Sequence, residues 1–252
     1  MIHFVGAGCG STDLITVRGL RFLEGADCVV YAGSLVNREL LDNCKASAEI
    51  YDSAHMTLEE VMDILISRAK DDKEVVRLHT GDPSLYGAIG EQIEILKKEA
   101  IEYDVTPGVT AAFGAAASIG CELTLPGITQ TVIFTRVEGR TPMPEAESIR
   151  SLSMHNASMA VYLSATRVEE LQRELLEGGY KEDIPVAICY KVSFPEEKII
   201  ITSIKDMVKE TISNNLTLTT LFLISNTIKA DSFDKSCLYS TDFSTCFREA
   251  KE

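Results

Sequence analysis

The stretch EVVRLHTGDPSLYG, residues 74–87, decides the fold. Its first five residues form a short, mainly apolar run that is typical of a buried strand, and a polar loop follows at once. In open α/β sheets, ligands bind beyond the carboxyl ends of the strands, where such a loop lies. Gly81 permits close approach of a ligand to the backbone, and Asp82 adds negative potential. The alternative is a plain helix start capped by Asp82 or Ser84.

Strands and helices alternate on both sides of this stretch, which predicts an α/β protein with a mainly parallel sheet in its first half. Strands are expected at 2–5, 28–31, 49–51, 74–78 and 103–106, and helices at 13–24, 57–69 and 88–98. Beyond residue 108 the pattern changes, with strands expected at 131–135, 159–163, 185–190, 198–201 and 217–224, and helices at 145–154, 168–176 and 204–212. The short spacing between the strands at 185–190 and 198–201 indicates antiparallel pairs. We therefore predict two α/β domains, residues 1–108 and 109–228, and a polar tail over 229–252.

Two more of the expected strands end in glycine-containing loops, Gly6–Gly10 and Pro107–Ala111. The first loop has Ser11 where a dinucleotide fingerprint needs glycine, and the second strand ends without an acid, which disfavours NAD or FAD. Taken alone, the loop Gly6–Gly10 could be a plain turn, and the loop Pro107–Ala111 could be an interdomain linker. The carboxyl ends of parallel strands meet at one edge of the sheet, so the three loops together predict one ligand site.

A fourth candidate is the stretch from Gln130 to Glu145, in which Arg136 and Arg140 flank a loop containing Gly139. The planar guanidinium group binds carboxylates with two parallel hydrogen bonds. These arginines are therefore candidates for binding an anionic ligand. The alternative is a solvated loop in which one arginine pairs with Glu138.

Composition excludes several classes of protein. The 252 residues contain 24 Lys and Arg against 38 Asp and Glu, a net charge of −14, which opposes binding to nucleic acid or an anionic membrane. Seven cysteines occur without a CxxC pair, so neither a disulfide framework nor a zinc site is expected. The four histidines show no metal-binding spacing, so no metal is predicted. Reduced cysteines and the lack of a signal peptide or a membrane-spanning run predict a cytoplasmic protein.

The three loops, in this order, resemble the tetrapyrrole methylases, which are class III S-adenosylmethionine-dependent methyltransferases. The motifs that carry the resemblance are Gly6–Gly10 with Leu14–Leu20, Gly81-Asp82-Pro83 with Tyr86-Gly87, and Pro107–Ala111. The resemblance covers about residues 1–228. It implies two α/β domains with the active-site cleft between them, S-adenosylmethionine as cofactor, a tetrapyrrole substrate and a homodimer.

The resemblance also implies site residues. Cofactor contacts are expected at Cys9, Gly81, Asp82, Pro83, Leu85, Thr110, Ala111, Leu163, Val192 and Thr219. Residues expected to hold the substrate carboxylates are Arg136 and Arg140, with His79 and Lys191 as weaker candidates. Members that methylate uroporphyrinogen have an acid directly after the tyrosine of the second strand, where this chain has Ala32. Their acid–base pair therefore does not transfer, and the catalytic residues stay open.

Three segments, 31–37, 77–87 and 138–145, narrow the resemblance to family members of cobalamin biosynthesis. The sequence leaves open whether the substrate carries cobalt, and another tetrapyrrole methylation step is an alternative. Other family members methylate an RNA ribose or diphthamide. Outside this chemistry, the alternatives are a nicotinamide-dependent oxidoreductase and a catalytically silent ligand-binding relative.

Overall fold

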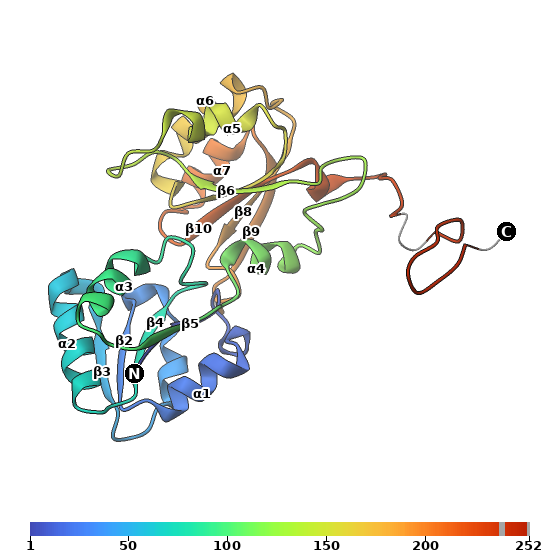
Figure 1. Ribbon diagram of the computed structural model, residues 1–252. Helices are drawn as coiled ribbons and strands as arrows, with labels where there is room; N and C mark the ends of the chain where they lie inside the picture. The colour runs from blue at the N-terminus through green and yellow to red at the C-terminus, as the bar shows by residue number, and fades with distance from the viewer. Residues whose placement is uncertain (237–239, 251–252) are drawn as a thin grey trace. The chain divides into compact units, whose positions relative to one another are not determined.

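The computed structural model describes residues 1–236 and 240–250. The chain divides into two compact units: unit 1 contains Met1–Ala115 and Lys191–Lys198, and unit 2 contains Ala116–Tyr190 and Ile199–Glu252. Each unit contains one five-stranded sheet flanked by helices (Figure 1). The predicted α/β class is confirmed, and the predicted boundary at residue 108 stays a prediction.

The sheet of unit 1 is parallel and has the strand order β3-β2-β4-β1-β5. Its strands are β1 (Ile2–Gly6), β2 (Cys28–Tyr31), β3 (Glu49–Asp52), β4 (Val75–His79) and β5 (Tyr103–Thr106). All five strands run in the same direction, so their carboxyl ends form one edge. This edge carries the three loops that the sequence singled out.

Helices cover both faces of this sheet. They are α1 (Val17–Gly25), α2 (Leu58–Lys70) and α3 (Ile89–Lys98), followed by α4 (Ala111–Ser118), which crosses from unit 1 into unit 2. Val5 and Leu78 lie in the core on the α1 face, whereas Phe4 lies among residues of α2 and α3 on the other face. A capping box begins α2, because Glu60 N donates to Thr57 Oγ1 and Thr57 N donates to Glu60 Oε2.

The sheet of unit 2 has the order β6-β7-β10-β8-β9. Its strands are β6 (Val132–Arg136), β7 (Ser158–Tyr162), β8 (Pro185–Tyr190), β9 (Lys198–Ser203) and β10 (Thr220–Ile224). Strand β6 is parallel to β7, whereas β10 is antiparallel to both β7 and β8. The antiparallel pairing expected in this half is confirmed, and β8 and β9 are neighbours as predicted.

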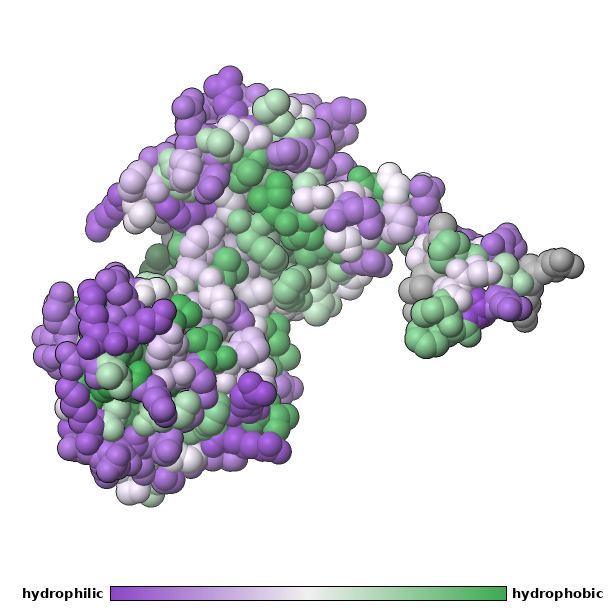
Figure 2. Space-filling view, in the orientation of Figure 1, coloured by the Kyte–Doolittle hydropathy of each residue, from purple (hydrophilic) through white to green (hydrophobic). Residues whose placement is uncertain are grey.

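The helices of unit 2 are α5 (Ile149–Ser153), α6 (Val168–Glu177) and α7 (Met207–Ser213). Leu171 and Leu175 of α6 pack with Val161 and Phe222 of the sheet in one buried core. Figure 2 shows hydrophilic residues over the outer helices of each unit, which include α2 and α3 in unit 1 and α5 and α6 in unit 2. No helix among residues 1–236 and 240–250 is long and apolar enough to cross a bilayer.

Several predicted boundaries were wrong, for local reasons. The helix expected at 13–24 is a 3-10 turn, Thr12–Leu14, followed by α1, because the extended Thr16 accepts from Gly19 N and starts a new helix. The helix expected at 145–154 is likewise divided at Ser148, which caps α5. The strand expected from residue 217 begins only at Thr220, because Thr219 has a φ of 60°.

Candidate active site

Three glycines from three different strand ends meet at the carboxyl edge of unit 1. A Cβ atom on Gly108 would lie 2.0 Å from the Gly81 carbonyl oxygen, and one on Gly6 would lie 2.6 Å from the same atom. Gly8 and Gly81 also exchange backbone hydrogen bonds, with N–O distances of 3.3 and 2.8 Å. Only glycine permits this approach, so the close packing of the three loops explains why each contains glycine.

Asp82 joins the loop that follows β4, here called the second loop, to the loop that follows β5, the third loop. Its Oδ2 accepts a hydrogen bond from Gly108 N at 2.9 Å, and its Oδ1 accepts one from Ser84 N at 2.8 Å. The bond from Ser84 N is the capping contact expected if this loop were a plain helix start. The bond from Gly108 N, in contrast, joins the ends of β4 and β5. Both carboxylate oxygens therefore point at backbone donors, and the loop contributes a fixed negative charge to the edge.

The first loop is held by a segment from far along the chain. Cys9 Sγ lies 3.3 Å from Ser193 Oγ, and the same hydroxyl accepts from Ser11 N at 2.9 Å. A Cβ on Gly114 would lie 2.5 Å from Cys9 Sγ and 2.9 Å from a methyl carbon of Val192. Burial raises the pKa of the Cys9 thiol, which stays protonated at neutral pH. Cys9 and Val192, both predicted cofactor contacts, are thus brought together within unit 1.

The other predicted cofactor residues of unit 1 belong to the same edge. Thr110 is buried directly before α4, and Ala111 begins that helix. Pro83 is buried and Leu85 half-buried in the loop after β4. A Cβ on Gly81 would come no closer than 3.7 Å to Thr110, so the second loop and the start of α4 lie side by side.

Two residues that hold the first loop were missed by the sequence analysis. One is Ser193, described above, and the other is Asn37, whose Nδ2 donates to the Gly10 carbonyl at 3.0 Å. Asn37 also caps the 3-10 helix Arg38–Asn43 by accepting from Glu39 N at 3.1 Å. A serine and an asparagine in loops carry no sequence signal for these long-range contacts.

His79 occupies a different place from the one expected of a carboxylate-binding residue. Its side chain is buried at the end of β4, and its Nε2 has no hydrogen-bond partner. Burial and the charge of Arg77 lower its pKa to about 3, so the imidazole is neutral at physiological pH. A buried neutral imidazole offers no charge to a substrate carboxylate, so these surroundings argue against that role.

In unit 2, Arg136 and Leu163 lie at one edge of the sheet. Arg136 ends β6 opposite Tyr162, the last residue of the parallel strand β7, and Leu163 follows. The two strand ends are joined because Ser164 Oγ accepts from Val137 N at 2.8 Å. Thr219 precedes β10, which runs antiparallel to β7 and therefore begins at this same edge.

The two predicted arginines differ in their surroundings. Arg136 donates to the Val137 carbonyl at 3.3 Å and to the Thr141 carbonyl at 3.0 Å, so its guanidinium group holds its own loop. Arg140 is exposed and has no hydrogen bond or ion pair among the described residues. Arg140 is therefore the more available of the two for an anionic ligand. Lys191 pairs with Glu196 at 3.1 Å and is half-buried.

Several unusual backbone angles lie at predicted site residues. Ten described non-glycine residues have positive φ, of which Leu163, Lys191 and Thr219 are predicted site residues and Tyr86 belongs to the motif after β4. A positive φ is rare for Leu and rarer still for a β-branched residue, and such strain clusters at ligand sites. Leu163 is also 69% exposed, although it is a large apolar residue.

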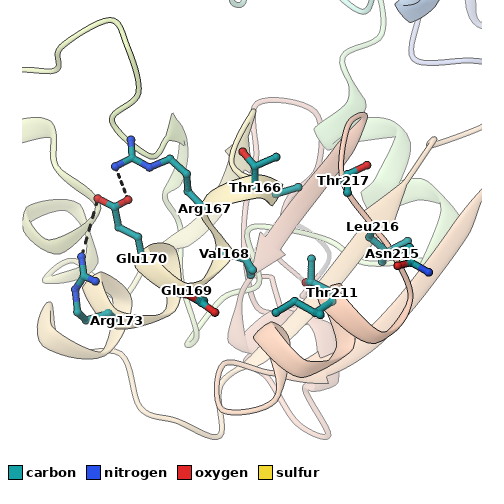
Figure 3. Close-up of a pocket in the computed structure, with 12 residues that line it drawn as sticks. Thr166, Arg167, Val168, Glu169, Glu170, Arg173, Thr211, Asn215, Leu216 and Thr217 are labelled. Atoms are coloured by element: carbon teal, nitrogen blue, oxygen red, sulfur yellow. Dashed lines mark ion pairs between the residues drawn. The ribbon is translucent and has the colours of Figure 1, made fainter.

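Unit 2 also contains an open pocket of about 660 Å³ between the start of α6 and the end of α7 (Figure 3). Three of its charged residues are paired with one another, since Glu170 lies 2.5 Å from Arg167 and 4.0 Å from Arg173. Thr166 and Thr217 line it, but none of the predicted site residues does.

Comparison with known proteins gives a consistent result. The family model described as Tetrapyrrole (Corrin/Porphyrin) Methylases matches residues 1–208. A Methanocaldococcus jannaschii protein named cobalt-precorrin-4 C(11)-methyltransferase is 45% identical, over 99% of this chain and 96% of the relative. A Pseudomonas aeruginosa protein named precorrin-4 C(11)-methyltransferase is 39% identical, over 98% of each chain.

Among solved structures, the X-ray structure of a cobalamin biosynthetic enzyme, cobalt precorrin-4 methyltransferase, matches with a TM-score of 0.88 and 43% identity. The match covers 91% of this chain and 96% of that one. The family resemblance seen in the three loop motifs is therefore confirmed along nearly the whole chain. The protein belongs to the tetrapyrrole (corrin/porphyrin) methylases.

Proposed function

We propose that the protein transfers a methyl group from S-adenosylmethionine to C-11 of cobalt-precorrin-4, giving cobalt-precorrin-5 in cobalamin biosynthesis. The observation that carries this proposal is the closed arrangement of Gly6, Gly81 and Gly108 at one sheet edge, with Asp82 fixed between two of the loops. The choice of substrate rests on the names of relatives that match over nearly their full length. The cobalt form is preferred because the relatives named for it are 45% and 43% identical, against 39% for a relative named for precorrin-4.

The residues at this edge fit S-adenosylmethionine. The mutual contacts of the three glycine loops fix their backbones at this edge, and Asp82 supplies a negative charge suited to a cation. Thr106 at the end of β5 has a buried hydroxyl without a hydrogen-bond partner among the described residues. This hydroxyl could therefore form a hydrogen bond with a ligand at the same edge. The residues that would hold the cofactor in unit 1 are Cys9, Gly81, Asp82, Pro83, Leu85, Thr110, Ala111 and Val192. Leu163 and Thr219 are the remaining residues for which the family resemblance implies a cofactor contact.

S-Adenosylmethionine supplies, when bound, an electrophilic methyl group on a positively charged sulfur. The tasks left to the protein are to orient the reacting groups and to exclude water, and orientation alone can contribute about 7–11 kcal/mol. The glycine loops perform the first task, because their mutual contacts fix the backbone that faces the ligand. Asp82, with both oxygens held by backbone donors, favours a cation over a neutral product without moving.

The first test is isothermal titration with S-adenosylhomocysteine, the product of methyl transfer. We expect one site per chain. No binding at high ligand concentration by folded protein would contradict the cofactor assignment. A parallel titration with NADH distinguishes the nicotinamide-dependent alternative, and turnover distinguishes an enzyme from a silent ligand-binding relative.

Arg140→Ala is expected to raise the KM for the tetrapyrrole about tenfold, because one charge-assisted hydrogen bond to a substrate carboxylate contributes about 1.5–3 kcal/mol. The KM for S-adenosylmethionine should stay unchanged. Steady-state kinetics with each substrate varied in turn measures both. The matched control is Arg150→Ala, an exposed arginine of α5 that pairs with Glu177 at 3.4 Å. Unchanged tetrapyrrole kinetics in the Arg140 variant would remove this residue from the site.

We further propose that the enzyme is a cytoplasmic homodimer. The homodimer is implied by the family that the sequence resembles, and the cytoplasmic location follows from the cysteine pattern. The six described cysteines are free thiols, which suits a reducing compartment. Sedimentation equilibrium tests the oligomeric state, with a mass of twice 27.6 kDa expected.

A further inference from the structure

A second cluster of polar side chains lies at the carboxyl edge of unit 1, on strands that the three glycine loops do not follow. Tyr31 ends β2, and Asp52 ends the neighbouring parallel strand β3 in register with it. Tyr31 Oη donates to Asp52 Oδ2 at 2.9 Å, and Arg38 Nη2 donates to the same oxygen at 3.0 Å. The other carboxylate oxygen accepts from Ala54 N at 2.9 Å.

This arrangement holds the Arg38 guanidinium group in one place while leaving most of it exposed. The Arg38 side chain is 70% exposed, and its Cζ lies 5.9 Å from the centre of the Tyr31 ring. Among the described residues, its partners are the carboxylate of Asp52 and the neighbouring phenol of Tyr31. The remaining N–H groups of the guanidinium fork therefore face solvent and can donate to a second carboxylate.

A buried positive charge, that of Arg77, is connected to this cluster by hydrogen bonds. Arg77 is 8% exposed, and its Nη1 donates to the Val30 carbonyl and to Ser53 Oγ. It has no carboxylate partner among the described residues. Ser53 Oγ in turn donates to the Tyr31 carbonyl at 2.9 Å. Arg38, Asp52 and Arg77 together carry one net positive charge, on a chain whose total is −14.

An exposed ion pair alone contributes little and indicates no site. The same two strands provide a comparison at their amino ends, where Lys45 pairs with Asp27 at 3.1 Å. There, Asp27 accepts its other bond from Glu74 N, and no buried phenol or buried cation of the described chain contacts the pair. The pair at the carboxyl edge differs because Tyr31, only 5% exposed, is hydrogen-bonded to its acid.

We propose that Arg38 binds a carboxylate of the tetrapyrrole substrate, and that Tyr31 and Asp52 are positioning residues that aim its guanidinium group. The inference rests on the proposed function, in which the substrate is a polycarboxylate macrocycle. It adds Arg38 to the residues for which a contact with a substrate carboxylate is proposed. It also gives a role to Tyr31, which lacks the adjacent acid of the uroporphyrinogen-methylating members. Here the acid that meets the tyrosine comes from β3.

The test is a fluorescence titration with uroporphyrin III, a stable polycarboxylate tetrapyrrole, which needs no turnover. Arg38→Ala is expected to raise the Kd of this probe about tenfold or more, and Arg38→Lys to recover part of the loss. Tyr31→Phe keeps the ring but frees Asp52, and should raise the Kd about threefold. Titration with S-adenosylhomocysteine should give the same affinity in all three variants. In the methyl-transfer assay, the KM for the tetrapyrrole should rise while kcat changes little.

Lys45→Ala is the matched control and should leave the Kd of uroporphyrin III unchanged. An unchanged Kd in Arg38→Ala would overturn the proposal, and so would an equal loss in Lys45→Ala, which would indicate only general electrostatics. Loss of S-adenosylhomocysteine binding in Arg38→Ala would also overturn it, since the residue would then be structural. Failure of the proposed function gives a different result, namely no methyl transfer by the wild-type protein although Arg38 still determines porphyrin affinity.

Discussion

Gly108→Ala is expected to lower the rate of methyl transfer about 100-fold, because a displacement of about 1 Å at a site can cost this much. The new Cβ would lie 2.0 Å from the Gly81 carbonyl oxygen and 2.9 Å from the Gly6 Cα atom. Both neighbours are backbone, so the strain can be relieved only by moving the second and third loops apart. That movement would also stretch the bond from Gly108 N to Asp82. Overpacking of this kind also destabilises a fold by about 1–3 kcal/mol.

The measurements are isothermal titration with S-adenosylhomocysteine and steady-state kinetics on protein shown to be folded by circular dichroism. Gly90→Ala is the matched control, since a Cβ on that glycine of α3 would meet nothing within 4 Å. Alanine in a helix interior stabilises it by up to about 1 kcal/mol relative to glycine, so this variant should be fully active and slightly more stable. Wild-type affinity and rate in Gly108→Ala would show that the contact between the loops does not shape the site.

Acidification is expected to destabilise the protein through His79. Its pKa is lowered to about 3 by burial and by Arg77, whereas a histidine in the unfolded chain titrates near 6.5. Above pH 6.5 the imidazole is neutral in both states and contributes no pH dependence. Below that pH the unfolded chain takes up a proton that the folded chain does not accept until about pH 3. The free energy of unfolding should therefore fall as the pH falls through this window, by about 2 kcal/mol at pH 5.

Urea unfolding at pH 7 and pH 5 of the wild-type protein and of His79→Gln measures this contribution. Carboxylates and other groups titrate equally in both proteins, so the difference between them isolates His79. We expect the variant to lose about 2 kcal/mol less than the wild type between the two pH values. His55→Gln removes an exposed histidine and should behave like the wild type. Equal losses in the wild type and His79→Gln would mean that His79 is protonated in the folded state, which would restore it as a carboxylate ligand.

The alternation of strands and loops was sufficient to predict the α/β class and the edge of unit 1 that carries the glycine loops. Parallel strands place their carboxyl ends together whatever their order, so loops far apart in sequence could be assigned to one site. The glycines were expected to let a ligand approach the backbone, whereas the contacts that the structure shows at them join the backbones of the three loops. That Gly6 and Gly108 both approach the Gly81 carbonyl depends on the strand order, with β4 and β5 flanking β1.

Contacts that depend on tertiary structure could not be predicted. Tyr31 and Asp52 are separated by 21 residues and meet only because β2 and β3 pair in register. Ser193 reaches the first loop although 182 residues separate it from Ser11. His79 was expected to line the cleft because it adjoins the central motif. Alternation along β4 instead directs its side chain to the sheet face that α2 and α3 cover, where its ring lies 5.9 Å from that of Phe4.

The most direct test of the account is methyl transfer itself. The protein would be incubated with cobalt-precorrin-4 and S-adenosylmethionine labelled with ¹³C in its methyl group, and the product analysed by mass spectrometry and NMR. The account predicts one labelled methyl group per macrocycle, attached at C-11, and one equivalent of S-adenosylhomocysteine. A methyl group at another carbon would contradict the assigned position. The absence of both products from folded protein that binds S-adenosylhomocysteine would contradict the proposed function.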